Sequence, residues 1–105
     1  MGSFSLLRGC PGASKAALNS MTQSLALALG RANVRVAAVA PGFVETDMAA
    51  EVLAGPRGSD IRGQSPFGRV ATPAEVARVV LFLADTSSTW LSGSVVDCNG
   101  ASYLH

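Results

Sequence analysis

The chain has 105 residues and a formal net charge of +1; 49% of its residues are apolar and 14% are charged. A chain of this length forms one domain at most, and its charged fraction is well below the roughly 25% of average soluble domains. Because the charge is nearly balanced and the arginines are scattered, we expect neither a nucleic acid nor a membrane as a partner.

The first predicted element is a helix over about Ala13 to Arg31, closed by Gly30. Its apolar face repeats every four residues, at Ala17, Met21, Leu25 and Leu29. A strand over Val34–Ala40 follows and ends at Pro41-Gly42. It is almost wholly apolar, which is typical of parallel strands covered on both faces. A helix that leads into such a strand is half of a βαβ unit, so the sequence predicts an α/β fold.

Thr46–Ala54 is predicted to be a short helix with Thr46 as its cap. We expect Gly55–Ser65 to be a loop, because it is rich in glycine and proline. Thr72-Pro73-Ala74-Glu75 has the residues of a capping box and predicts the start of a long helix.

We expect Trp90 to anchor a core or an interface, and Val95–Asp97 to form a last short strand before a turn at Asn99-Gly100. Two parallel strands cannot cover the apolar faces of two long helices. The sheet is therefore expected to continue in residues outside this chain.

No apolar stretch reaches the ~20 residues of a membrane span, and the first ten residues lack the features of a secretory signal. Cys10 and Cys98 do not have a metal-binding spacing, so we expect no metal site and two reduced thiols. These features predict a reducing location, in the cytoplasm or an organellar lumen, with no visible targeting segment.

Four segments together resemble the classical short-chain dehydrogenase/reductase family, closest to its 3-oxoacyl-carrier-protein reductase-like and tropinone-reductase-like members. They are residues 12–18 (GASKAAL), 36–48 (VAAVAPGFVETDM), 67–77 (FGRVATPAEVA) and 82–100 (from FLAD through LSG to NG). The resemblance implies a doubly wound Rossmann-type parallel sheet, of which residues 1–105 are the C-terminal part without the dinucleotide-binding half. It makes Val34–Ala40 the sixth strand, Val95–Asp97 the seventh, and Thr46–Ala54 a lid over the substrate.

The family's catalytic pair is a tyrosine four residues before a lysine, which places both on one face of a helix. Lys15 matches that lysine, which also holds the nicotinamide ribose in the family. Pro11 stands where the tyrosine would be, and Cys10 is one residue out of register. A local deletion before Gly12 would also explain the gap. The alternative for Lys15 is a solvated surface lysine, and Tyr103, at the far end of the chain, has no role in this scheme.

The resemblance also implies a cofactor site at Pro41, Gly42, Val44 and Thr46. In the family this turn lies under the nicotinamide, the backbone at Val44 meets the carboxamide and Thr46 hydrogen-bonds the cofactor. The alternative is an ordinary turn at a strand end with a capping threonine.

The family's glycine-rich loop, its Asn-Asn-Ala-Gly segment and its catalytic serine are not found in these residues. NAD or NADP is the implied cofactor, but the adenine half has no visible seat, so we do not expect tight binding.

Three hypotheses follow. The chain is a truncated oxidoreductase, inactive alone, of a family that acts on small-molecule carbonyl substrates; or it is a non-catalytic module that forms homo- or hetero-oligomers with full-length relatives; or another chain supplies its first half.

Overall fold

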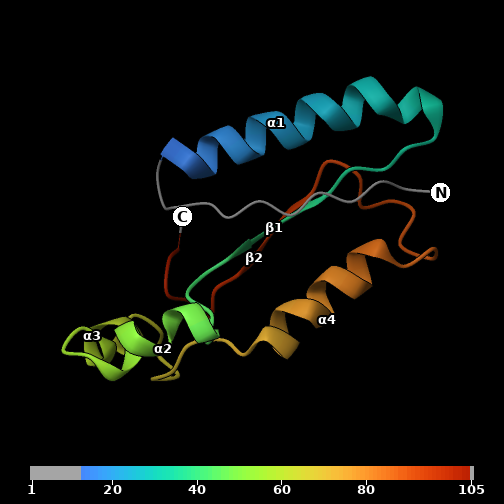
Figure 1. Cartoon of the computed structure of the whole chain (residues 1–105). Helices are drawn as coiled ribbons and strands as arrows, with labels where there is room; N and C mark the ends of the chain where they lie inside the picture. Colours follow the sequence, from blue (N-terminus) through green and yellow to red (C-terminus); the bar gives the residue numbers. More distant parts are fainter. Residues whose placement is uncertain (1–12, 105) are drawn as a thin grey trace.

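The computed structural model describes residues 13–104, with side chains from Lys15 onward. The sequence interpretations of Cys10, Gly12 and Pro11 therefore lie outside the described residues. The elements, in chain order, are α1 (Ala13–Leu29), the 3₁₀-helix η1 (Gly30–Ala32), β1 (Ala38–Pro41), α2 (Asp47–Ala54), α3 (Gly58–Gly63), α4 (Pro73–Ala84) and β2 (Val95–Cys98) (Figure 1).

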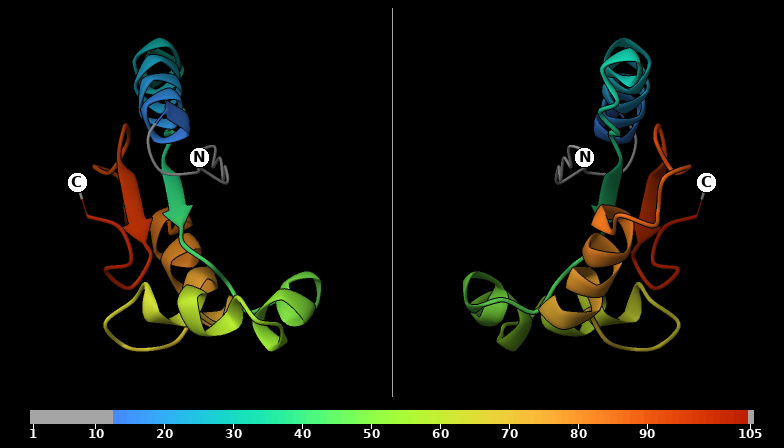
Figure 2. Two further views of the ribbon diagram at one scale, coloured as in Figure 1. Left: turned by 90° about the vertical axis from the view of Figure 1, so that its left-hand side faces the viewer. Right: turned by 90° about the vertical axis from the view of Figure 1, so that its right-hand side faces the viewer.

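The two strands form a parallel sheet with a helix on each face. Ala38 lies opposite Val95, and Pro41 lies opposite Cys98. Because side chains alternate along a strand, Ala38 and Ala40 pack with Leu18 of α1, whereas Ala37 and Val39 pack with Leu83 of α4. Figures 1 and 2 show α1 and α4 on opposite sides of the strands. The α/β class and the two-sided covering predicted from the sequence are confirmed.

β1 is shorter and later than the predicted strand over Val34–Ala40. Residues 34–37 do not pair with a strand, because the chain opposite them turns. There the backbone N–H of Val36 donates to Ser92 Oγ at 3.1 Å, and the N–H of Gly93 donates to the Val36 carbonyl at 2.7 Å. Regular pairing begins only at Ala38, opposite Val95.

The predicted loop over Gly55–Ser65 is wrong, because it contains α3. Its glycine and proline content disfavours a helix, but tertiary packing overrides that propensity. Ile61 is 5% exposed, and Gly58 is buried where α3 follows α2. By contrast, the predicted short helix is confirmed as α2: the backbone N–H of Ala49 donates to Thr46 Oγ1 at 3.2 Å.

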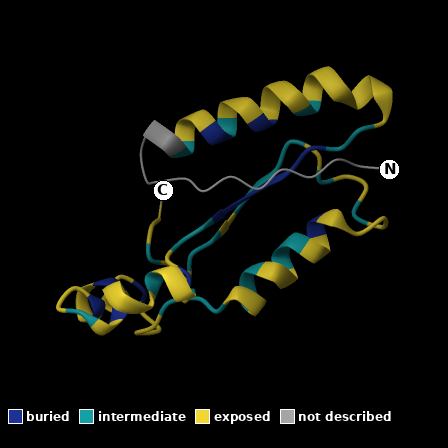
Figure 3. Cartoon of the chain, in the orientation of Figure 1, coloured by how far each residue is buried: buried dark blue, intermediate teal, exposed yellow. Residues whose placement is uncertain are grey.

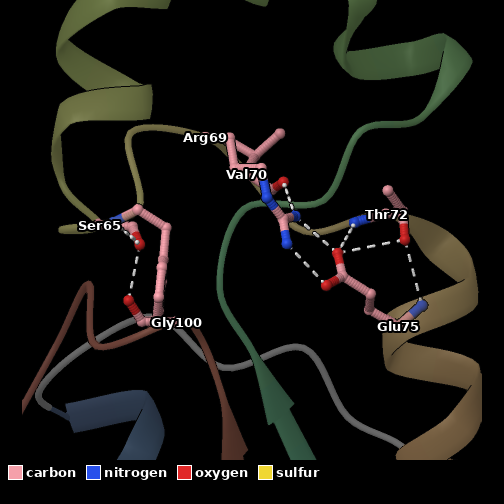
Figure 4. Close-up of polar contacts among 7 residues, drawn as sticks. Ser65, Arg69, Val70, Thr72, Glu75 and Gly100 are labelled. Carbon is pink, nitrogen blue, oxygen red and sulfur yellow. Dashed lines mark hydrogen bonds and ion pairs between the residues drawn. The ribbon is translucent and has the colours of Figure 1, made fainter.

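The predicted capping box is confirmed at the start of α4 (Figure 4). The Glu75 N–H donates to Thr72 Oγ1 at 3.2 Å, and the Thr72 N–H donates to Glu75 Oε1 at 2.9 Å. Arg69 adds two bonds that the sequence did not predict, donating to both Glu75 carboxylate oxygens at 2.7 and 2.9 Å. The Arg69 hydrogen bonds, followed by that of the Thr72 backbone, lower the pKa of Glu75 from 4.5 to about 2.

Both long helices carry many exposed residues (Figure 3), and large apolar side chains are among them. Leu27 of α1 is 81% exposed and Leu81 of α4 is 70% exposed. Trp90 is 96% exposed, so it does not lie in the core of the described residues. The other alternative, that it anchors an interface, stays a prediction. Within residues 13–104, no helix has the length and apolar character needed to cross a membrane.

Candidate functional site

The candidate site lies where β1 and β2 end, next to α2 and α3 (Figure 2). In open α/β sheets, ligands bind at the carboxyl ends of the strands. After β1, the Gly42 N–H donates to the Cys98 carbonyl at 3.3 Å, which keeps the two chain segments together past the sheet. A Cβ at Gly42 would lie 2.9 Å from the Asn99 Cβ and 3.2 Å from the Ser102 Oγ. Glycine therefore allows the C-terminal turn to approach the turn after β1.

Val44 forms an isolated parallel β-bridge with Ala71, and its own backbone N–H and carbonyl point away from Ala71. The Ala71 N–H donates to the Phe43 carbonyl at 3.1 Å, and the Glu45 N–H donates to the Ala71 carbonyl at 2.8 Å. In a parallel bridge, the residues flanking Val44 make these bonds, so its N–H and carbonyl point to the opposite side. This backbone can present a donor and an acceptor to a ligand.

Thr46 caps α2 through an oxygen lone pair, and its hydroxyl hydrogen can still be donated. The ordinary-turn interpretation correctly describes this cap. The cap does not exclude a ligand, because a threonine hydroxyl accepts and donates at once.

Lys15 forms an ion pair with Asp97, which lies on β2. The side chains of Lys15 and Asp97 are 13% and 30% exposed, so the solvated-surface interpretation of Lys15 is wrong. No role for Asp97 was predicted from the sequence. No local pattern could have identified it, because 82 positions separate the two residues.

A hollow of about 720 Å³ brings the five predicted site residues together: Lys15, Pro41, Gly42, Val44 and Thr46 all line it. We refer to it as the large hollow. Its volume is within the range of small-molecule sites. Met48 and Val52 of α2 also line it, which is the position expected of a lid.

Tyr103 also lines the large hollow, which the sequence analysis did not expect. It is the only tyrosine in the chain. The Asn99 Nδ2 donates to the Tyr103 carbonyl at 3.0 Å, and the Ser102 N–H donates to the Asn99 carbonyl at 3.0 Å. This tight turn, which Gly42 accommodates, brings the end of the chain back to the site.

A second, small hollow of about 360 Å³ lies beside the first, and five residues line both: Phe43, Gln64, Asp97, Asn99 and Ser102. The segment after α3 is fixed here by Ser65, whose hydroxyl donates to the Gly100 carbonyl at 2.7 Å (Figure 4). The Cys98 thiol also lines this hollow, and burial raises its pKa. No cluster of three or more metal-ligating side chains occurs in the part of the chain that the structure describes.

Comparison with known proteins decides the family. A family model described as enoyl-(acyl carrier protein) reductase matches residues 8–100. This chain belongs to the short-chain dehydrogenase/reductase family. A 3-oxoacyl-[acyl-carrier-protein] reductase, FabG, from Aquifex aeolicus is 46% identical over 89 residues, which are 85% of this chain and 36% of that protein. The chain thus spans about a third of the length of this curated relative.

Two solved structures of the same family share the fold. The short-chain dehydrogenase/reductase from Brucella melitensis superposes with a TM-score of 0.80 at 31% identity, covering 97% of this chain and 45% of that one. The angucycline C-6 ketoreductase LanV, solved with bound NADP, gives a TM-score of 0.80 at 28% identity, covering 96% of this chain and 44% of that one. The chain is therefore similar in fold to slightly less than half of each of these two structures.

Proposed function

We propose that this chain provides the nicotinamide- and substrate-facing part of an NAD(P)-dependent oxidoreductase that interconverts a carbonyl and an alcohol. The substrate class is that of a 3-oxoacyl thioester, by similarity to the FabG relative. The observation that carries the proposal is the convergence of Lys15, Gly42, Val44 and Thr46 on one hollow at the strand ends.

The residues present fit the nicotinamide end of a dinucleotide. The Thr46 hydroxyl and the Val44 N–H can donate to a carboxamide, and the Lys15 ammonium can donate to ribose hydroxyls. The close approach of Asn99 and Ser102 leaves no room for a side chain at Gly42. When bound, the dinucleotide would supply the hydride, while this chain's residues orient it and exclude water.

We further propose that the 105-residue polypeptide by itself does not turn over a ketone. Reduction of a carbonyl needs a proton donor beside the hydride, and proline at position 11 has no proton to give. In addition, these residues contain no glycine-rich loop for the pyrophosphate.

The binding part of the proposal is tested by NMR titration of the ¹⁵N-labelled chain. Nicotinamide mononucleotide should bind weakly and shift the amide signals of Gly42, Val44 and Thr46, whereas AMP should shift none of them. Thr46→Ser keeps the cap and the donor and should still bind. Thr46→Asp keeps a capping oxygen but has no hydroxyl, and should lose binding. Equal binding of AMP, or shifts confined to other residues, would refute the proposal.

Turnover is tested with NADPH and an acetoacetyl thioester, and we expect none from the chain alone. Measurable turnover would contradict the proposed inactivity. If a Tyr103→Phe variant then lost that turnover, the proton would be traced to the one phenol that lines the hollow.

A second function, as a non-catalytic module, is favoured by the exposed apolar side chains of α1 and α4. Leu27 on α1 and Leu81 on α4 are both largely exposed. Large exposed apolar patches mark sites of interaction with other proteins. On this proposal the chain pairs with a full-length family member. Co-expression with such a relative should give co-elution in size exclusion, and Leu27→Glu should abolish it. Separate elution of the unmodified chain would refute the pairing.

A further inference from the structure

Among the described residues that line the large hollow, one ion pair joins two elements far apart in sequence, α1 and β2. Lys15 lies in the first turns of α1, and Asp97 lies on β2, opposite Ala40. Lys15 and Asp97 are 82 positions apart in the sequence, so the pair forms only when α1 is packed on the sheet. It links the helix that carries the lysine to the strand end that forms the wall of the hollow.

No other carboxylate lines the large hollow beside Lys15. Among the described residues that line it, Lys15 and Asp97 are the only charged ones. Glu45 and Asp47, which lie nearby in sequence to the lining residues, are not among them. Asp97 also lines the small hollow, whereas Lys15 does not. The carboxylate therefore lies at the boundary of the two hollows, and the ammonium is held against that boundary.

The lysine end of the pair is largely withdrawn from water, whereas Asp97 is an exposed residue of β2. An exposed ion pair has little influence on where its partners lie, because water competes for both charges. The Lys15 side chain is only 13% exposed, and an ammonium withdrawn from water needs a partner of opposite charge. Its place in the hollow therefore depends on Asp97.

We propose that Asp97 is the positioning residue for Lys15. Its carboxylate holds the ammonium at the wall of the large hollow. An ammonium has three N–H donors. One donated to Asp97 leaves two for a ligand, such as a pair of ribose hydroxyls. The use of those donors in the reaction rests on the proposed function; the pairing itself does not.

The chain allows a direct test, because Lys15 is its only lysine. The Lys15 amine nitrogen attacks the acyl carbon of an acylating reagent, and loses a proton as the reagent's leaving group departs, only after the ion pair has opened. Cleavage at arginine separates the peptide of residues 9–31, which contains Lys15, from residues 1–8, which carry the terminal amine. The ratio of label on the two peptides at pH 8 then reports the pairing of Lys15 against an internal reference.

We expect Asp97→Asn to raise the labelling ratio of Lys15 about fivefold. Asp97→Glu keeps the charge and should restore part of the protection. Glu51→Gln removes one negative charge from α2 outside the hollow, and should label like the unmodified chain. Circular dichroism confirms that each variant compared is folded.

Ionic strength gives a second measurement that does not depend on a variant. In the unmodified chain, labelling of Lys15 should rise between low salt and about 0.5 M salt, because salt screens a partly exposed pair. Labelling that is unaffected both by Asp97→Asn and by salt would overturn the proposal. So would a variant that lowers the unfolding midpoint without changing the labelling, because that result would show a merely structural role.

Discussion

Gly58 offers the sharpest test of how α2 and α3 pack beside the site. A Cβ built at this position would lie 1.9 Å from the Leu53 carbonyl oxygen and 2.7 Å from its carbonyl carbon. Both atoms belong to the backbone of α2, so no side-chain rotation can relieve the contact. Gly58→Ala therefore forces α3 away from α2, and we expect a cost of about 1–3 kcal/mol, as for overpacked cores.

Gly63 provides the matched control, because it ends the same short helix and a Cβ there meets nothing within 4 Å. Gly63→Ala should be neutral or stabilising, by up to about 1 kcal/mol, because alanine loses less backbone entropy than glycine. The two substitutions add the same methyl group at positions 58 and 63 of the chain. The contacts that distinguish them are those with the Leu53 backbone and, at 2.9 Å, with the end of the flexible Arg62 side chain.

Limited trypsin digestion measures the effect locally, because Arg57 directly precedes α3 and Arg62 lies within it. Cleavage of a transiently opened segment follows its opening equilibrium, which changes about fivefold per kcal/mol. We expect Gly58→Ala to be cut at these arginines at least five times faster than the unmodified chain, and Gly63→Ala no faster. Equal rates for the two variants would refute the described packing of α3 on α2.

Three further predictions concern α4 and β2. Thr72→Ala should cost about 1 kcal/mol and lower the melting temperature by about 4–8 °C, whereas Thr72→Ser should not, as followed by circular dichroism. The pKa of Glu75 is about 2 when folded and 4.5 ordinarily, so its contribution to stability is complete above pH 4.5 and is lost as pH falls towards 2. The urea midpoint of Glu75→Gln should therefore fall less between pH 6 and pH 2.5 than that of the unmodified chain; an equal fall would contradict this. Because burial, and then Glu75, raise the pKa of Cys98, its thiol should react with iodoacetamide at pH 8 more slowly than free cysteine; an equal rate by peptide mass spectrometry would contradict it.

The sequence by itself determined the features that depend on residues within about four positions of one another. The caps at Thr46 and Thr72, the long helix from Ala13 and the buried character of the strand before Pro41 were all predicted correctly. The apolar stripe predicted for that helix is not its buried face: Met21, Leu25 and Leu29 are exposed, and Leu18 is buried. Each correct prediction rests on a local hydrogen bond or on a periodic apolar pattern, and all the residues that form such a bond or pattern lie close together in the sequence. The family resemblance, built from four such local segments, was confirmed for the same reason.

Only the tertiary structure decided which distant groups meet. Asp97 reaches Lys15, and Tyr103 reaches the hollow, because the parallel sheet and the tight approach at Gly42 bring the end of the chain back to α1. α3 was missed because glycine and proline disfavour a helix locally. In the folded chain, however, α3 packs so closely on the Leu53 backbone that only glycine fits at position 58. Contacts between residues tens of positions apart depend on how whole elements pack, and no local pattern of residue types encodes that packing.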